Sequence, residues 1–187
     1  DLAESFRQES PQDFPARPDG TVRYAHLALS GGGANGAFGA GFLNGWSSTQ
    51  TRPVFKIVTG VSTGALMAPF AFIGADYDLA LQQFYTTTSS RDIFLLGPTF
   101  GLPWQLMAGA LPLQDMIARH VDEQLLQRVA QAHQRGRRLY IGTANIDAPR
   151  FVVWNMGLIA SSRRPDALEL FRKVMLASAS IPVAFPP

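Results

Sequence analysis

The clearest candidate for chemistry in the sequence is a serine between two glycines, Gly60-Val61-Ser62-Thr63-Gly64. It lies between the apolar run VFKIVTG, which has the length of a strand, and the stretch ALMAPFAFIGA, which is typical of a helix. At a strand-to-helix turn a serine takes a strained backbone conformation that exposes its hydroxyl, and Gly60 and Gly64 would let neighbouring chain approach. The helix N-terminus also favours a developing negative charge. The pattern predicts Ser62 as a nucleophile in this turn, the nucleophile elbow, with an ordinary Gly-rich turn as the alternative.

A second Gly-rich segment, GGGANG, begins at Gly31 and also separates an apolar run from a predicted helix. Three successive residues without side chains leave backbone N–H groups accessible. A tetrahedral oxyanion needs such donors at about 3 Å. Gly31, Gly32 and Gly33 are therefore predicted to form an oxyanion hole.

The same segment also matches the dinucleotide-binding pattern GxGxxG, through Gly31, Gly33 and Gly36. An NAD site needs an acidic residue about 20 positions further on, and the chain has no Asp or Glu between Asp19 and Asp76. Arg52 could instead meet the 2′-phosphate of NADP, so an NADP-binding module stays open as an alternative. A P-loop is excluded because no Gly-Lys-Ser/Thr follows the glycines.

The histidines bear on a different alternative, an α/β-hydrolase esterase with a Ser-Asp-His triad in that chain order. His26 precedes Ser62 on a predicted strand, while His120 and His133 lie near the apolar stripe of a predicted helix. These positions favour packing or surface roles, because a catalytic histidine usually stands on a loop above the sheet. A histidine beyond Pro187 would keep this alternative open.

The elements that must position these groups alternate along the chain. Strands are predicted at 22–30, 54–60, 137–146 and 151–156, with a helix after each Gly-rich turn and another at 166–180. Apolar residues spaced by four from Leu113 to Val129 predict one amphipathic helix that stops near Gly136. This alternation predicts an α/β fold, a three-layer α/β/α arrangement around a mainly parallel sheet.

Composition limits the other function classes. The chain has 187 residues, 47% of them hydrophobic, a net charge of +2 and no Cys, which fits one globular domain and excludes a disulfide framework. No grouping of His and carboxylates has metal-site spacing, so neither a metal nor a cofactor is expected. Nucleic acid is not indicated, since Arg135, Arg137 and Arg138 are better explained as capping a helix end.

Two segments fall outside the predicted core. Residues 1–21 are polar and Pro-containing and predict an extended leader before a catalytic domain at 22–187, which would fit an exported or cell-envelope protein. Residues 93–114 carry no charge, but their Pro and Gly would break a membrane-spanning helix. We expect either a buried connector there or an apolar loop that contacts lipid at a membrane surface.

Three motifs, LALSGGGANGAFGAG, VTGVSTGAL and ASASIPVAFPP, together resemble the patatin-like phospholipase family over Tyr24 to Pro187. The resemblance implies Ser62 as nucleophile, Gly31 to Gly33 as oxyanion donors, and an ester of a lipid or phospholipid as substrate. It also implies a Ser–Asp dyad whose Asp stands in an Asp-Gly-Gly or Asp-Gly-Ala motif. The only Asp followed by Gly here is Asp19, so we expect the dyad Asp beyond Pro187.

Two consequences follow from this comparison with the family pattern. Asn35 stands where members commonly carry Lys or Arg, which puts a phosphate-attracting role, and with it phospholipid preference, in doubt. Without the dyad Asp, residues 1–187 alone are expected to be inactive. A non-catalytic lipid-binding fragment is therefore a further alternative.

Overall fold

The computed structural model describes residues 1–86 and 113–180, and they are built around one four-stranded sheet. The strands are β1 (Ala25–Leu29), β2 (Phe55–Val61), β3 (Arg138–Asn145) and β4 (Arg150–Asn155), in the order β1-β2-β3-β4. The first three strands are parallel, and β4 returns antiparallel to β3 as a hairpin. The predicted mainly parallel sheet is confirmed.

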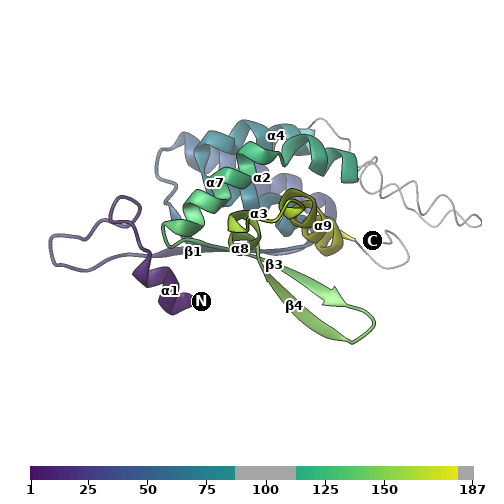
Figure 1. Ribbon diagram of the computed structural model, residues 1–187. Coiled ribbons are helices and arrows are strands. Elements are labelled where there is room, and N and C mark those ends of the chain that lie inside the picture. The colour runs from purple at the N-terminus through teal and green to yellow at the C-terminus, as the bar shows by residue number, and fades with distance from the viewer. Residues whose placement is uncertain (87–112, 181–187) are drawn as a thin grey trace, which may run out of the picture.

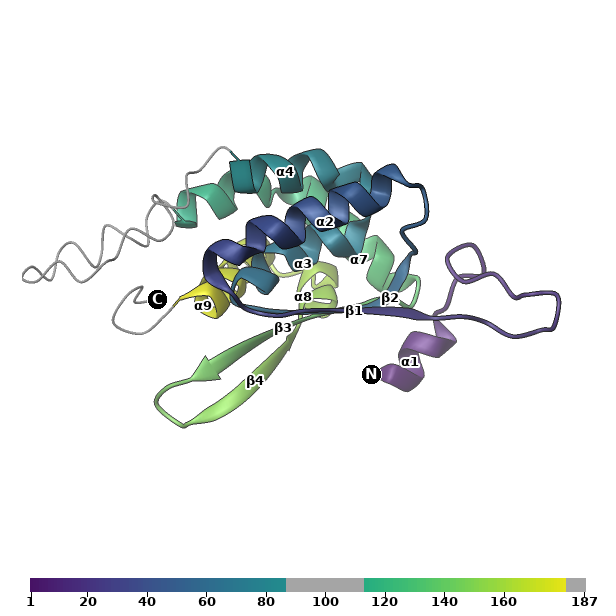
Figure 2. The same cartoon turned by 180° about the vertical axis from the view of Figure 1, so that it is seen from behind.

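Helices flank this sheet on both sides (Figures 1 and 2). Parallel strands that follow one another in both sequence and space, joined by right-handed crossovers, place their connecting helices on one face. That face carries most of the helices, whereas α1 lies on the other side of the sheet. The predicted three-layer α/β/α fold class is confirmed. The helix bounds are α1 (Leu2–Arg7), α2 (Gly36–Ser48), α3 (Thr63–Ile73), α4 (Asp78–Thr86), an unlabelled helix at 113–120, α7 (Glu123–Gln134), α8 (Met156–Ser161) and α9 (Ala167–Ala179).

Helix α3 lies at the centre of the core. All its residues except Ile73 are buried, because it packs on β2 and is surrounded by α2, α4, α7 and α9. A helix in such a place is apolar on every side. The residue that begins α3 is thereby fixed against a rigid body of sheet and helices.

The amphipathic segment after Leu113 differs from its prediction. Its apolar stripe is buried as expected, with Val121 fully buried, but the chain forms two helices, 113–120 and α7, rather than one. Asp122 has an extended backbone, with φ −108° and ψ −179°, and its carboxylate accepts a hydrogen bond from the N–H of Leu125. This N-cap starts a new helix, although the apolar stripe continues through both helices.

The first 21 residues also differ from the extended leader expected from their composition. They contain α1 and bury Ser5 and Phe14. The Ser5 hydroxyl donates to the carbonyl of Gly136, and Lys56 on β2 forms a 2.6 Å ion pair with Glu9. The segment is therefore packed on the sheet, and a domain boundary at residue 22 stays a prediction.

None of the helices described is long and apolar enough to span a membrane. Nearly all of segment 93–114, for which a connector or a lipid-facing loop is expected, lies outside the described residues. Its contact with a membrane surface stays a prediction.

Candidate active site

Ser62 directly follows β2 and is the N-cap of α3, as the sequence pattern predicts. Its backbone has φ 54° and ψ −126°, and positive φ is uncommon and costly for a residue with a side chain. The side chain is half-buried. Such strain at a strand-to-helix turn is the geometry of a nucleophile elbow.

The backbone around this turn is packed so closely that positions 60 and 64 have no room for a side chain. A Cβ on Gly60 would collide with the carbonyl group of Gly64. A Cβ on Gly64 would collide with the carbonyls of Leu29 and Ser30, at the end of β1. The two glycines therefore let α3 start close to both β2 and β1.

The Gly-rich segment lies beside Ser62. Because β1 and β2 are parallel and paired up to Leu29 and Gly60, the chain after each strand emerges at the same edge of the sheet. A Cβ on Gly31 would lie 3.1 Å from the Ser62 Cβ and 3.7 Å from its Oγ. The fold thus brings together the two motifs that the sequence singled out separately.

The backbone of this segment is open to an incoming group. Gly31 and Gly32 are exposed, and within residues 1–86 and 113–180 their N–H groups have no hydrogen-bond partner. Gly33 has φ 54°, a conformation that favours glycine. These features are those that an oxyanion hole needs, namely free donors on a fixed backbone next to a nucleophile.

A contact between helices holds the two motifs at this spacing. Gly36 is buried at the start of α2, where a Cβ would collide with the Thr63 hydroxyl and the Tyr85 phenol group. The Tyr85 and Thr63 hydroxyl oxygens are 2.8 Å apart, and the Tyr85 hydroxyl also donates to the Thr63 carbonyl. Burial raises the pKa of Tyr85 to about 12, so the phenol keeps its proton. The sequence analysis assigned no role to Thr63 or to Tyr85.

Ser178, a third residue whose role the sequence analysis missed, contacts Ser62 directly. The N–H of Ser62 donates to Ser178 Oγ at 3.0 Å, and Ser178 Oγ donates to the carbonyl of Gly142 at 2.6 Å. Ser178 lies in α9, within the motif ASASIPVAFPP, whose last seven residues are outside the described residues. The motif was the available indication, but only the fold shows its contact with Ser62.

The histidines lie elsewhere. His26 is exposed on β1, and the ring of His120 packs against Phe84. His133 is buried beside Arg138, and burial lowers its pKa to about 4, with a further contribution from the Arg138 charge. In the described part of the chain none of the three forms a hydrogen bond with Ser62. The described residues also contain no group of three potential metal ligands.

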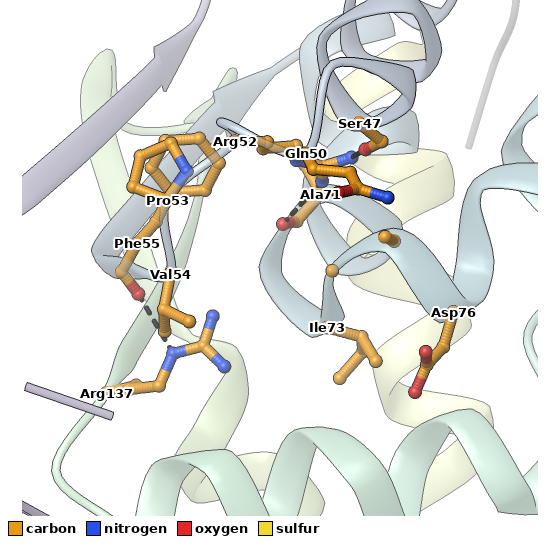
Figure 3. A pocket seen from close by; sticks show the side chains of 12 residues that line it. Ser47, Gln50, Arg52, Pro53, Val54, Phe55, Ala71, Ile73, Asp76 and Arg137 are labelled. Atoms are coloured by element: carbon orange, nitrogen blue, oxygen red, sulfur yellow. Dashed lines mark hydrogen bonds between the residues drawn. The ribbon is translucent and has the colours of Figure 1, made fainter. Parts of the chain in front are cut away.

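The arginines lie at the far end of α3 and β2 from Ser62. Arg52 and Arg137 line a pocket of about 370 Å³ there, where Arg52 donates to the Ala71 carbonyl and Arg137 to the Phe55 carbonyl (Figure 3). Arg137 also donates to the carbonyl of Phe72 in α3. Cations at a helix C-terminus stabilise the helix. Arg137 therefore stabilises the C-terminal end of α3, whereas Arg138 donates to the His133 carbonyl at the end of α7. Arg135 pairs with Asp13 instead.

Arg52 is also unsuited to the NADP alternative. It forms a 2.7 Å ion pair with Asp78 and lies before β2, whereas the Gly-rich segment follows the carboxyl end of β1. A dinucleotide phosphate on that segment would therefore be at the opposite edge of the sheet from Arg52. The structure gives this alternative no support.

Comparison with known proteins bears on this site. No curated protein matches the chain. The family model of the patatin-like phospholipases matches residues 27–187, which include both Gly-rich turns and Ser178. This match supports lipid acyl hydrolysis as the general class of activity. Because it covers most of the chain, the protein belongs to the patatin-like phospholipase family.

Proposed function

We propose that the protein hydrolyses lipid acyl esters, with Ser62 as the nucleophile and Gly31, Gly32 and Gly33 as the oxyanion donors. The observation that carries this proposal is the position of Gly31, whose backbone lies against the Ser62 side chain. Two Gly-rich turns that follow different strands meet there, one with a strained serine and the other with N–H groups that find no partner among residues 1–86 and 113–180. Family membership supplies the class of substrate.

The proposed reaction is nucleophilic acyl transfer. Ser62 Oγ attacks the ester carbonyl carbon as its proton passes to a base, and the carbonyl oxygen becomes an oxyanion facing Gly31 to Gly33. Loss of the alcohol leaves an acyl group on Ser62, and water then releases the fatty acid. We assign the base to the Asp expected beyond Pro187. The exposed Asn35 beside the donors carries no charge, so we propose a carboxylic ester rather than a phosphate group as the feature recognised.

The two remaining alternatives differ in what they require. A Ser-Asp-His triad needs a histidine near Ser62, and the positions of His26, His120 and His133 give it no support. A non-catalytic lipid-binding fragment is favoured by one observation: within the described residues Ser62 has no contact with a base. Ester turnover by residues 1–187 alone would refute that alternative.

Labelling of the natural full-length chain by a fluorophosphonate tests the nucleophile. Wild-type protein should be labelled and Ser62→Ala should not. Ser48→Ala is the matched control, because Ser48 is exposed at the end of α2 and, in the part of the chain that the structure describes, its hydroxyl contacts only the Gly45 carbonyl. Labelling that persists in Ser62→Ala would exclude Ser62 as the nucleophile.

A further inference from the structure

The Ser178 hydroxyl joins the backbone of Ser62, directly after β2, to the backbone of Gly142 in the neighbouring strand β3. It accepts from the N–H of Ser62 at 3.0 Å and donates to the carbonyl of Gly142 at 2.6 Å. Backbone pairing between β2 and β3 ends at Val61 and Gly142. The hydroxyl therefore continues the contact between the strands at the point where β2 turns into the elbow.

Among the described residues, the Ser178 hydroxyl is the only hydrogen-bond partner of the Ser62 N–H. As the N-cap of α3, Ser62 contributes only its carbonyl to the helix, which accepts from Ala65 at 2.9 Å. Because β2 and its pairing with β3 both end at Val61, this N–H also lies outside the strand ladder. A half-buried donor without a partner is costly, so removal of the hydroxyl would favour rotation of the Val61–Ser62 peptide.

The direction and position of the Ser178 hydroxyl are both determined by the fold. Its proton is used in the bond to Gly142, which leaves a lone pair for Ser62. Helix α9 packs against both α3 and β3, so Ser178 is held between the two elements that it joins. A residue 116 positions away in sequence thereby fixes the peptide that carries the candidate nucleophile.

We propose that Ser178 is a positioning residue, which holds the strained backbone of Ser62 and thereby aims Ser62 Oγ relative to Gly31 and Gly32. This inference rests on the proposed function of Ser62. Ser178 acts through the Ser62 amide and does not touch the substrate. Its loss is expected to impair the chemical step rather than substrate binding, because rotation of the Ser62 peptide turns the Cα–Cβ bond away from the oxyanion donors.

The test compares Ser178→Ala with Ser178→Thr, which keeps the hydroxyl, in the natural full-length chain. Hydrolysis of p-nitrophenyl butyrate should show a kcat about 10-fold lower in Ser178→Ala, with KM within about twofold, and Ser178→Thr should restore most of the loss. Ser180→Ala is the matched control, since the Ser180 hydroxyl, at the C-cap of α9, contacts only the Leu176 carbonyl among the described residues. Its kcat should stay within about twofold of wild type.

The inference is overturned if Ser178→Ala lowers kcat no more than Ser180→Ala does, or if Ser178→Thr fails to restore it. Should Ser178→Ala not fold, Ser178→Cys keeps a similar volume with a much weaker hydrogen-bonding group and is subject to the same comparison. The inference is also overturned if Ser178→Ala and Ser180→Ala lower kcat equally and lower the melting temperature equally. That result would indicate a merely structural role for Ser178.

Hydrogen exchange at the Ser62 amide separates this inference from the proposed function. NMR should show faster exchange of that amide in Ser178→Ala than in wild type or Ser180→Ala, whatever the role of the Ser62 hydroxyl. Fluorophosphonate labelling that persists in Ser62→Ala would refute the proposed role of Ser62, but it would not affect the exchange measured in Ser178→Ala. Unchanged exchange in Ser178→Ala would overturn the inference even if Ser62 is the nucleophile.

Discussion

Gly31 lies so close to Ser62 that a methyl group on it would be 3.1 Å from the serine Cβ. This distance joins the two Gly-rich turns into one site and makes Gly31 a position where the smallest possible side chain has a measurable effect. The Cβ built on Gly31 would also lie 3.7 Å from Ser62 Oγ, so a side chain there would enter the space where the proposed reaction takes place.

Gly31→Ala is expected to lower kcat by about 10- to 100-fold, because the added methyl group would crowd Ser62, the proposed nucleophile, and displace the proposed oxyanion donors. The effect on stability should be small, since the segment is exposed. Steady-state kinetics and a thermal melt measure both quantities. Gly41→Ala is the control, because a Cβ there meets nothing within 4 Å; an equal loss of activity in the two variants would contradict the prediction.

Gly64→Ala is expected to destabilise the protein by at least about 2 kcal/mol, because its methyl group would overlap the backbone carbonyls of Leu29 and Ser30 in a packed interior. Gly45→Ala, on α2 with open space around it, should instead raise the free energy of unfolding by up to about 1 kcal/mol. Urea denaturation of both variants provides the comparison. Equal stability of the two would contradict the close approach of β1 to the elbow.

Lys56→Met is expected to destabilise the protein by about 3 kcal/mol, because it leaves Glu9 without the partner of a largely buried ion pair. The Lys56 ammonium is 2.6 Å from Glu9 and lies over the rings of Phe6, Phe14 and Tyr24. The exposed 2.6 Å pair of Lys173 and Glu169 supplies the control, and Lys173→Met should leave the free energy of unfolding nearly unchanged, because water screens an exposed ion pair. A negligible effect of Lys56→Met would mean that residues 1–21 are not bound to the sheet.

The sequence predicted those features that local geometry determines. A serine between glycines after an apolar run implies a strained strand-to-helix turn, and the structure has that turn at Ser62. The order of strands and helices likewise predicted a mainly parallel sheet. Each of these features is determined by residues that are close together in the sequence, so it could be predicted without knowledge of the fold.

What the sequence did not predict depends on contacts across the fold. Ser178 meets Ser62 only because α9 packs beside α3, and Tyr85 meets Thr63 only because α4 does. The break at Asp122 was missed for a different reason. The apolar period runs through both helices in register, so the N-cap at Asp122 was the sole local indication of two helices.

The pH dependence of stability should reveal the buried state of His133. In the unfolded chain this imidazole takes up a proton near pH 6.5, whereas in the fold its pKa is lowered to about 4, chiefly by burial. The unfolded state therefore binds more protons between these values, and the free energy of unfolding should fall as pH falls from about 6.5 to about 4, by at most about 1.4 kcal/mol per pH unit. Above pH 6.5 and below pH 4 this residue contributes no slope.

His133→Leu tests this assignment, because leucine occupies the buried site without titrating. Urea denaturation at several pH values should show a flatter dependence between pH 6.5 and 4 in the variant than in wild type. The comparison uses the slope rather than the absolute stability, since the substitution also removes the contact of the ring with Arg138. Identical slopes in the two proteins would show that His133 titrates normally and is accessible to water in the folded state.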